Sequence, residues 1–314
     1  MEPPRGTTQS CPLPIPRPEL GVPHDSTPTT HILKPAIAGY ANHDVNEYLS
    51  MRAAAAFGIP AAQTDVLMVN DTLSVLVSTR YDRREREGSW SRIHQEDFCQ
   101  ALSVLPEHKY QDRGGPGIAH MADLIAQIRN RKDREESRTR FFDGLLFNIA
   151  AWATDAHAKN YSILLAGDRQ TLAPLYDIAS HAPYPSVPNS PPEASAMKIG
   201  GEYALARIGK AHLLKAAARI RVDTDWASAR IDEVRQNVSH TYAEAAMTLA
   251  GVPSLRRAAQ HVVDSVHQKS KDRGWVDNTS TIDLALTTQH SRQDDSAARD
   301  SQSNSGNSTT ANLG

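Results

Sequence analysis

The stretch Thr154-Asp155-Ala156-His157-Ala158-Lys159-Asn160 is the densest run of chemically active side chains within an otherwise apolar part of the sequence. It follows a segment with helical spacing of apolar residues, 140–152, and precedes the strand-like run YSILL. A loop held between two buried elements often carries functional groups that face a cleft. Asp155 and Asn160 form the pattern D-x-x-x-x-N, and Asp177 follows later in LYDIAS.

These residue types suit phosphoryl transfer. The reaction needs a carboxylate that accepts or orients the proton of the attacking hydroxyl, and oxygen ligands that hold Mg²⁺. Protein kinases supply them as a catalytic-loop Asp, an Asn five residues later and a further metal-binding Asp. They also use a strand lysine that contacts the phosphates and a helix glutamate that pairs with it. Lys34 in HILK and Glu47 in the next predicted helix complete that order.

The spacing of apolar residues predicts a small mixed part followed by a larger helical part. Strands are expected at 30–35, 63–69 and 73–79, the last two as a hairpin around Asn70-Asp71, and a second hairpin at YSILL-AGDRQ-TLAPLYD. Helices are expected at 45–59, from IHQEDFCQAL onward, at 118–131, at 140–152, and through 210–274 with a break at 251–253. The run 82–87 is expected to be a solvated loop. The charged run 129–140 is expected to be an exposed connection, with a basic contact for DNA or tRNA as the alternative.

The composition excludes several classes of protein. The 314 residues are 39% hydrophobic and 22% charged, which is enough to bury a core. Lys and Arg number 34 against 36 Asp and Glu, so the net charge of -2 excludes a global polycation but not a local basic patch. The sequence contains no apolar run of about 18 residues and no signal-peptide core at its start, so no membrane segment is expected. Two cysteines, Cys11 and Cys99, make neither a disulfide framework nor a Cys-based zinc site, and favour the cytoplasm.

Both ends of the chain predict disorder. Residues 1–29 carry eight prolines, which remove backbone donors and favour an extended arm. Residues 277–314 are mostly Ser, Thr, Asn, Asp and Gln, and such a tail cannot bury enough apolar surface to offset the entropy of ordering. Between these ends we expect a small mixed part at 30–82 and a larger helical part at 83–276.

The sequence resembles the HipA family of bacterial toxin Ser/Thr kinases. The resemblance rests on the runs TPTTHILKP, HQEDFCQAL, KYQDRGGPGIA, ATDAHAKNYS and LAPLYDIAS, which stand in the family's order. It implies an α+β, protein-kinase-like fold of the HipA type, with a shortened N-terminal lobe at 30–82 and a mainly helical C-terminal lobe at 83–276 that carries the catalytic hairpin.

The resemblance also implies an activity and partners. The activity is transfer of the γ-phosphate of ATP, with Mg²⁺, to a protein hydroxyl. The implied protein substrate is a translation factor such as an aminoacyl-tRNA synthetase. The implied partner is a DNA-binding helix-turn-helix antitoxin of the HipB type, so that contact with DNA is only indirect.

Roles follow from the resemblance residue by residue. Asp155 matches the proton acceptor, Asn160 and Asp177 match the metal ligands, and Glu47 is the expected ion-pair partner of the strand lysine. Thr79 stands where family members often carry an acidic residue. The residues implied to bind ATP come from the strand, the lobe-linking segment and the catalytic hairpin: Lys34, Thr79, Arg80, Tyr81, His157, Lys159, Asn160, Tyr176 and Asp177.

The sequence departs from the family pattern before Lys34. Family members carry a small β subdomain and a Ser/Gly-rich phosphate loop there, whereas this sequence has a short Pro-rich stretch in which GTTQS does not match that loop. The serine that members autophosphorylate has no clear counterpart either. We therefore expect a truncated kinase core or one that works with a separate N-terminal subunit. The alternative is a catalytically silent protein that binds an antitoxin or such a subunit.

Simpler interpretations of the same residues stay open. Asp155 and His157 are also suited to capping a helix end. Together with His181 they would also suit a transition-metal site. Lys34 would also suit an ordinary surface position, because most lysines are exposed. Glu47 would also suit the first turn of a helix, where the helix dipole favours an acidic residue.

Overall fold

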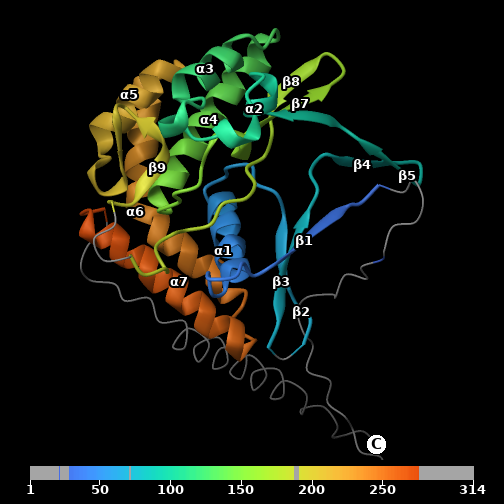
Figure 1. Cartoon of the computed structure of the whole chain (residues 1–314), viewed down its shortest axis with the longest axis vertical. Helices are drawn as coiled ribbons and strands as arrows, with labels where there is room; N and C mark the ends of the chain where they lie inside the picture. The colour runs from blue at the N-terminus through green and yellow to red at the C-terminus, as the bar shows by residue number, and fades with distance from the viewer. Residues whose placement is uncertain (1–20, 22–27, 71, 187–190, 276–314) are drawn as a thin grey trace, which may run out of the picture.

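The computed structural model describes residue 21 and residues 28–70, 72–186 and 191–275 (Figure 1). The expected arm at 1–29 lies almost wholly outside the described residues, and the expected tail at 277–314 lies wholly outside them. Within the described ranges, no helix is long and apolar enough to cross a lipid bilayer.

The N-terminal part is a three-stranded antiparallel sheet with one helix. The strand order is β1-β3-β2, with β1 at His31–Pro35, β2 at Thr64–Met68 and β3 at Ser74–Thr79. This confirms the expected strand at 30–35 and the expected hairpin. Helix α1, His43–Ala56, confirms the helix expected at 45–59.

Helix α1 ends where the sequence predicts. Gly58 adopts a positive φ of 71°, and the amide of Ile59 donates to the carbonyl of Ala54 at 3.3 Å. This is the hydrogen-bond pattern of a Schellman cap, in which a glycine reverses the chain without the steric cost of a Cβ.

Five helices build most of the C-terminal part: α3 Ile118–Ala126, α4 Arg131–Ala150, α5 Lys210–Ile220, α6 Thr224–Met247 and α7 Pro253–Asp272. Every residue of α4 from Phe141 to Ala150 is buried, so this half of the helix is covered on all sides. Helix α1 contacts both the sheet and helices α6 and α7, and Figure 1 shows it between them. The core is therefore shared by the two parts of the chain.

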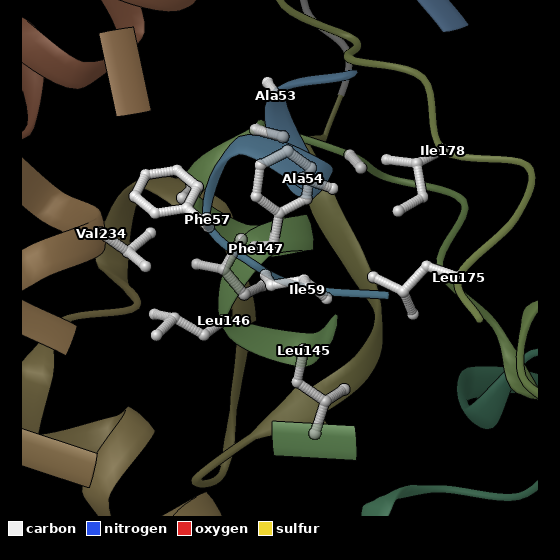
Figure 2. Close-up of a cluster of buried hydrophobic side chains, with 14 of the residues drawn as sticks. Ala53, Ala54, Phe57, Ile59, Leu145, Leu146, Phe147, Leu175, Ile178 and Val234 are labelled. Atoms are coloured by element: carbon white, nitrogen blue, oxygen red, sulfur yellow. The ribbon is translucent and has the colours of Figure 1, made fainter. Parts of the chain in front are cut away.

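Figure 2 shows how this shared core is built. Phe57 and Ile59 at the end of α1 meet Phe147 of α4, Val234 of α6 and Leu175 from the segment before Asp177. The backbone of Leu175 accepts from Ala62 at 2.8 Å and donates to Pro60 at 2.7 Å. These two hydrogen bonds fix the Asp177 segment against the N-terminal part.

The sequence analysis misplaced the structure around IHQEDFCQAL. Only α2, Phe98–Ala101, is helical, and β6, His94–Asp97, is a strand. β6 pairs with β7, Ser162–Ala166, which pairs with β8, Arg169–Leu172. The hairpin expected after Asn160 is therefore present, with β6 as a third strand, but its second strand ends at Leu172 and does not extend to Asp177 as expected. Asp97 begins α2 with a reciprocal capping box to Gln100, which explains why the run resembles a helix start.

Two further segments differ from expectation. The run expected as a solvated loop at 82–87 contains strand β4, Arg83–Arg86, which pairs with β5, Ser89–Arg92. Glu87 and Gly88 both have a positive φ, at 52° and 76°, as a two-residue hairpin turn requires.

The run expected as an exposed connection at 129–140 is mostly the first half of α4. Asn130 caps this helix through the amide of Asp133 at 3.2 Å, and Ser137 is buried where it accepts from the amide of Leu172 at 2.9 Å. The helix expected at 118–131 ends at Ala126, and the one expected at 140–152 begins nine residues earlier than predicted, at Arg131.

The stretch 210–274 is mostly helical, as expected, with one additional break. The break at 251–253 is confirmed, because α6 ends at Met247 and α7 begins at Pro253. A second break at 221–223 separates α5 from α6. The sequence analysis also missed the β9–β10 hairpin, Ala194–Ile199 and Glu202–Ala204, whose register shifts between its two pairs.

Candidate functional site

Two cavities adjoin each other at Asp177. The first, about 430 Å³, is lined by β1, the end of β3, the segment after it, and the β6–β7 side of the fold. The second, about 400 Å³, is lined by the segment that holds Asp155 and by aromatic residues such as Tyr110 and Tyr184. Asp177 lines both cavities, so we call them the lysine cavity, after Lys34, and the Asp155 cavity.

Lys34 lies between two carboxylates in the wall of the lysine cavity. Its Nζ is 2.6 Å from Oε1 of Glu47 and 2.5 Å from Oδ1 of Asp177. Glu47 is only 3% exposed, whereas the side chain of Asp177 is 51% exposed. The structure therefore brings together three residues that the sequence analysis selected from three separate segments.

The charges in this cluster shift one another's proton affinity. Burial raises the pKa of Glu47 to about 7, against the opposing effect of Lys34 and with help from the negative charge of Asp177. Burial by itself would lower the pKa of Lys34, but the two carboxylates outweigh it and raise that pKa above the ordinary value. One ammonium group thus lies between two carboxylates, and the buried one, Glu47, has the raised pKa.

Tyr176 and Asp177 are held in a fixed arrangement at the floor of the lysine cavity. The hydroxyl of Tyr176 donates to the carbonyl of Lys159 at 2.7 Å and lies 2.6 Å from Oγ of Ser162. Burial raises the pKa of Tyr176 well above its usual range. Asp177 itself has a φ of 59°, a left-handed conformation that a non-glycine residue adopts only where its surroundings hold it.

The end of β3 and the segment after it form another part of the wall of the lysine cavity. Thr79, Arg80 and Tyr81 all line it, and the ring of Tyr81 lies 5.9 Å from that of Tyr176, centroid to centroid. Arg80 donates two hydrogen bonds to the carboxylate of Asp82, at 2.9 Å and 2.7 Å. This bidentate pair keeps the guanidinium fixed at the cavity edge.

Lys159 also lines the lysine cavity, but its charge is already paired. Its Nζ donates to Oδ2 of Asp97 at 2.7 Å, and Asp97 is itself a cavity residue. The sequence analysis did not select Asp97. The only local signal was the D-x-x-Q capping pattern, which points to a helix start and not to a partner for Lys159.

Asp155 lies in the second cavity, with 63% of its side chain exposed. One carboxylate oxygen accepts a hydrogen bond from the hydroxyl of Tyr110. Tyr110 was not selected either, although it stands in the run KYQDRGGPGIA. The other oxygen of Asp155 is therefore the one that can accept from a further hydroxyl group.

Asn160 ties the two acidic segments together. Its amide nitrogen donates to the carbonyl of Asp155 at 3.0 Å and to the carbonyl of Asp177 at 3.4 Å. Asn160 is 8% exposed and does not line either cavity. Its amide oxygen is left as the atom that can bind another group, because the nitrogen is used by the backbone.

His157 is set back from both cavities. It is 4% exposed, and within the described ranges neither ring nitrogen has a hydrogen-bond partner. Its Nε2 lies 3.7 Å from Oδ1 of Asp155, and its ring packs edge-on against that of Tyr110. Burial lowers the pKa of His157. The residue lies next to Asp155 and lines neither cavity.

The transition-metal alternative gains no support. In the described part of the chain, no three His, Cys, Asp or Glu side chains gather into a possible metal site. Magnesium is a different case, since it is commonly held by one or two carboxylates together with the phosphates of a nucleotide. A donor set of Asp177 and Asn160 is of that kind.

The fold and the Lys34–Glu47–Asp177 cluster define a protein-kinase-like class of protein. The model of the HipA-like C-terminal domain family matches residues 9–242. This chain therefore belongs to that family.

Its curated relatives are named as kinases. It is 40% identical over 204 residues to the putative kinase Y4mE of Sinorhizobium fredii, an alignment that covers 65% of this chain and 47% of the relative. It is 29% identical over 165 residues to the serine/threonine-protein kinase toxin HipA of Shewanella oneidensis, which covers 48% of this chain and 37% of the toxin. The chain thus spans less than half the length of these two relatives.

A solved structure shows the same fold. The match is to the Shewanella oneidensis MR-1 toxin–antitoxin complex of HipA, HipB and operator DNA, with a TM-score of 0.65 at 23% identity. It covers 77% of this chain and 58% of the matched chain. The expected α+β, HipA-type kinase-like fold is confirmed.

Proposed function

We propose that this protein is a HipA-type serine/threonine kinase that transfers the γ-phosphate of ATP to a hydroxyl group of another protein. The observation that carries the proposal is the ammonium group of Lys34, held 2.6 Å from Glu47 and 2.5 Å from Asp177 at the wall of a cavity of about 430 Å³. This is the arrangement of lysine, glutamate and metal-binding aspartate on which phosphoryl transfer depends.

ATP and Mg²⁺ fit the residues of the lysine cavity. Its wall contains the ammonium group of Lys34, a guanidinium at Arg80 that Asp82 holds in place, and the aromatic ring of Tyr81. Lys34 would contact the phosphates, and Asp177 with the amide oxygen of Asn160 would hold Mg²⁺, which neutralises charge on the phosphates when bound. His157 supports Asp155 and Tyr110 from behind in this scheme.

Asp155 is the catalytic residue of the proposal. It faces the cavity on the far side of Asp177 from Lys34, so the acceptor hydroxyl and the nucleotide approach Asp177 from different cavities. The free oxygen of Asp155 would orient the acceptor hydroxyl and take its proton as the phosphate is transferred.

The partners follow from the relatives and are part of the same proposal. We propose an antitoxin of the HipB type, because the matched solved structure is a complex of HipA with HipB and operator DNA. A translation factor such as an aminoacyl-tRNA synthetase is the proposed protein substrate.

A radiolabelled-phosphate transfer assay, paired with calorimetry of ATP binding, tests the proposal. Because the alignment covers 47% of the Sinorhizobium relative, each assay is run with and without the part of that relative that this chain does not match, supplied as a separate polypeptide. Asp155→Asn should abolish transfer and change ATP affinity by no more than about twofold, since the carboxylate serves the acceptor and not the phosphates. The matched control is Asp168→Asn, an exposed residue in the β7–β8 turn, which should leave both unchanged.

The outcomes separate the possible roles. Equal transfer by the wild type and Asp155→Asn would remove Asp155 from the mechanism. ATP binding without transfer in every arm would favour the catalytically silent protein. Absence of ATP binding in every arm would refute the proposed function.

A further inference from the structure

A separate cavity, about 230 Å³, shares no lining residue with the lysine cavity or the Asp155 cavity. We call it the α4–α6 cavity, because it lies between the first half of α4 and the turn that leads from α5 into α6. Its lining residues are Glu135, Arg138, Thr139, Arg221, Val222, Asp223 and Trp226. Arg138 stands 12 residues before Ala150, the last residue of α4, so it lies about 18 Å along the helix from the end that leads to Asp155.

Two arginines of this cavity lack a carboxylate partner. Among the described residues, neither Arg138 nor Arg221 forms an ion pair, whereas Arg131 pairs with Glu135 at 2.7 Å and Arg219 with Asp123 at 2.6 Å. The Nε atom of Arg138 is also shielded from solvent and has no hydrogen-bond partner in the described part of the chain. A guanidinium N–H in that position loses its water without gaining an acceptor.

The positive charges also act on one another. Burial, and then the nearby charges of Arg221 and Arg134, lower the pKa of Arg138 and outweigh the opposing effect of Glu135. The side chain of Arg134 is anchored away from the cavity, because it donates to the carbonyls of Ile128 at 2.8 Å and Arg129 at 3.4 Å. Arg138 and Arg221 therefore remain as two like charges that an anion between them would stabilise.

The acidic residues of the cavity are already engaged. Oε1 of Glu135 accepts from Arg131 at 2.7 Å, and Oδ1 of Asp223 caps α6 by accepting from the amide of Trp226 at 2.8 Å. The indole of Trp226 is 37% exposed and packs edge-on against Phe142. The cavity thus combines two unpaired guanidinium groups, an anchored aromatic surface and a rim with negative charge.

We propose that the α4–α6 cavity binds the phosphate group of a phosphoserine or phosphothreonine within a polypeptide. A phosphate monoester carries about two negative charges and three acceptor oxygens, and two guanidinium groups bind such a group with directed hydrogen bonds. The exposed face of Trp226 would pack against the side chain next to the phosphorylated residue.

The rim favours a phosphorylated polypeptide over a nucleic acid. A nucleic-acid strand would bring several phosphates in succession toward Glu135 and Asp223, and the like charges would repel each other. A polypeptide carries one phosphate and presents backbone N–H groups that the same carboxylates can accept. The small volume of the cavity also suits one phosphate group. The inference stands without the proposed kinase activity, although that activity would produce this class of ligand.

Calorimetry on the full chain tests the site. The probe is a nine-residue Ala/Gly-rich peptide with a central phosphoserine, compared with the same peptide unphosphorylated, inorganic phosphate and a thymidine oligonucleotide. We expect saturable binding of the phosphopeptide that weakens with added salt, and binding at least about tenfold weaker for the unphosphorylated peptide.

Two variants locate the binding. Arg138→Gln and Arg221→Asn should each weaken phosphopeptide binding by about tenfold or more, since each removes a charge-assisted contact. Asparagine is chosen as the replacement at position 221 because Arg221 has a φ of 65°, and asparagine tolerates this left-handed conformation. Lys132→Gln, at an exposed position of the same helix and outside the cavity, is the matched control and should change affinity by less than about twofold. Unchanged circular dichroism and melting temperature show that each variant folds.

Several results would overturn the proposal. The first is that the wild type does not bind the phosphopeptide, or binds the unphosphorylated peptide with equal affinity. The second is that it binds the oligonucleotide at least as tightly as the phosphopeptide. The third is that it binds only free phosphate. Full retention of binding by both Arg138→Gln and Arg221→Asn would place the phosphate elsewhere and would also overturn it.

Discussion

Replacing Glu47 by glutamine should remove a pH dependence of stability that the candidate site imposes. Glu47 is 3% exposed, and burial raises its pKa from 4.5 to about 7. Between these two values the folded protein binds a proton at Glu47 that the unfolded chain does not bind. The free energy of unfolding therefore falls as the pH rises through this range, because the native state must then hold a buried carboxylate.

The structure sets the size of this effect. A pKa shift from 4.5 to about 7 corresponds to about 3 kcal/mol, since one pKa unit is worth about 1.4 kcal/mol. The side chain of Lys34 is 33% exposed, so solvent screens part of the interaction, and we expect about 1–3 kcal/mol. The unfolding free energy of Glu47→Gln minus that of the wild type should increase by this amount from about pH 4.5 to about pH 8.

Urea unfolding at the two pH values measures this difference, with equal m-values as the check on two-state behaviour.

The matched control is Glu135→Gln. Glu135 is exposed, and its hydrogen bond to Arg131 lowers its pKa, so its difference from the wild type should not rise with pH. Lys34→Met should keep the decline of the wild type and extend it above pH 7, because it removes the cation that lowers the pKa of Glu47. A difference for Glu47→Gln that stays flat, or that falls as the pH rises, would refute the reasoning.

Two further substitutions test the packing behind the site by urea unfolding. Gly200→Ala should lower the free energy of unfolding by about 2–4 kcal/mol, because φ is +58° and the new Cβ would lie 2.3 Å from the backbone oxygen of His212. The control Gly167→Ala, with φ +61° and nothing within 4 Å, should lower it by only about 1–2 kcal/mol. Equal losses of stability would contradict the steric argument. Arg230→Met should lower the free energy of unfolding by about 2–4 kcal/mol, because Asp143, which lies 2.8 Å from Nε of Arg230, would stay buried without its partner. The double variant with Asp143→Asn should recover part of that stability. No recovery would show that the charge of Asp143 is not the cause.

The sequence predicts those elements whose signals are local. The short runs of consecutive apolar residues in Thr64–Met68 and Ser74–Thr79 identify two strands, and the short Asn70-Asp71 separation identifies a hairpin. Gly58 marks a helix end because glycine readily adopts the left-handed conformation needed there. The segment 251–253 marks a break between helices because it contains a proline. In each case the residues that decide the structure are neighbours in the chain.

The elements that the sequence analysis missed depend on distant partners. Strand β6 reads HQED, which has little intrinsic preference for a strand, and it is extended because it pairs with Ser162–Ala166. The polar first half of α4 reads as a loop, yet Asp133 is buried there, because Arg169 from β8 neutralises it at 2.6 Å. Local propensity contains no information about either contact.

The candidate site shows the same division. The types and order of Lys34, Glu47, Asp155, Asn160 and Asp177 are visible in the sequence, and the family resemblance gives each an expected role. The partners of these residues are not visible. Tyr110 reaches Asp155 across 45 positions, and its hydroxyl contributes nothing to the pattern of apolar residues that predicts elements.

The amide of Asn160 explains how residues so far apart in sequence can form one site. Its nitrogen donates to the carbonyls of Asp155 and Asp177, so a single buried side chain fixes the backbones of both acidic segments relative to each other. Asp177 is fixed a second time, because the neighbouring Leu175 is hydrogen-bonded to Pro60 and Ala62 of the N-terminal part. The side chain of Asp177 therefore stands where the lysine cavity and the Asp155 cavity adjoin. This arrangement supports the proposed division of labour, in which a nucleotide and an acceptor hydroxyl approach one carboxylate from two sides.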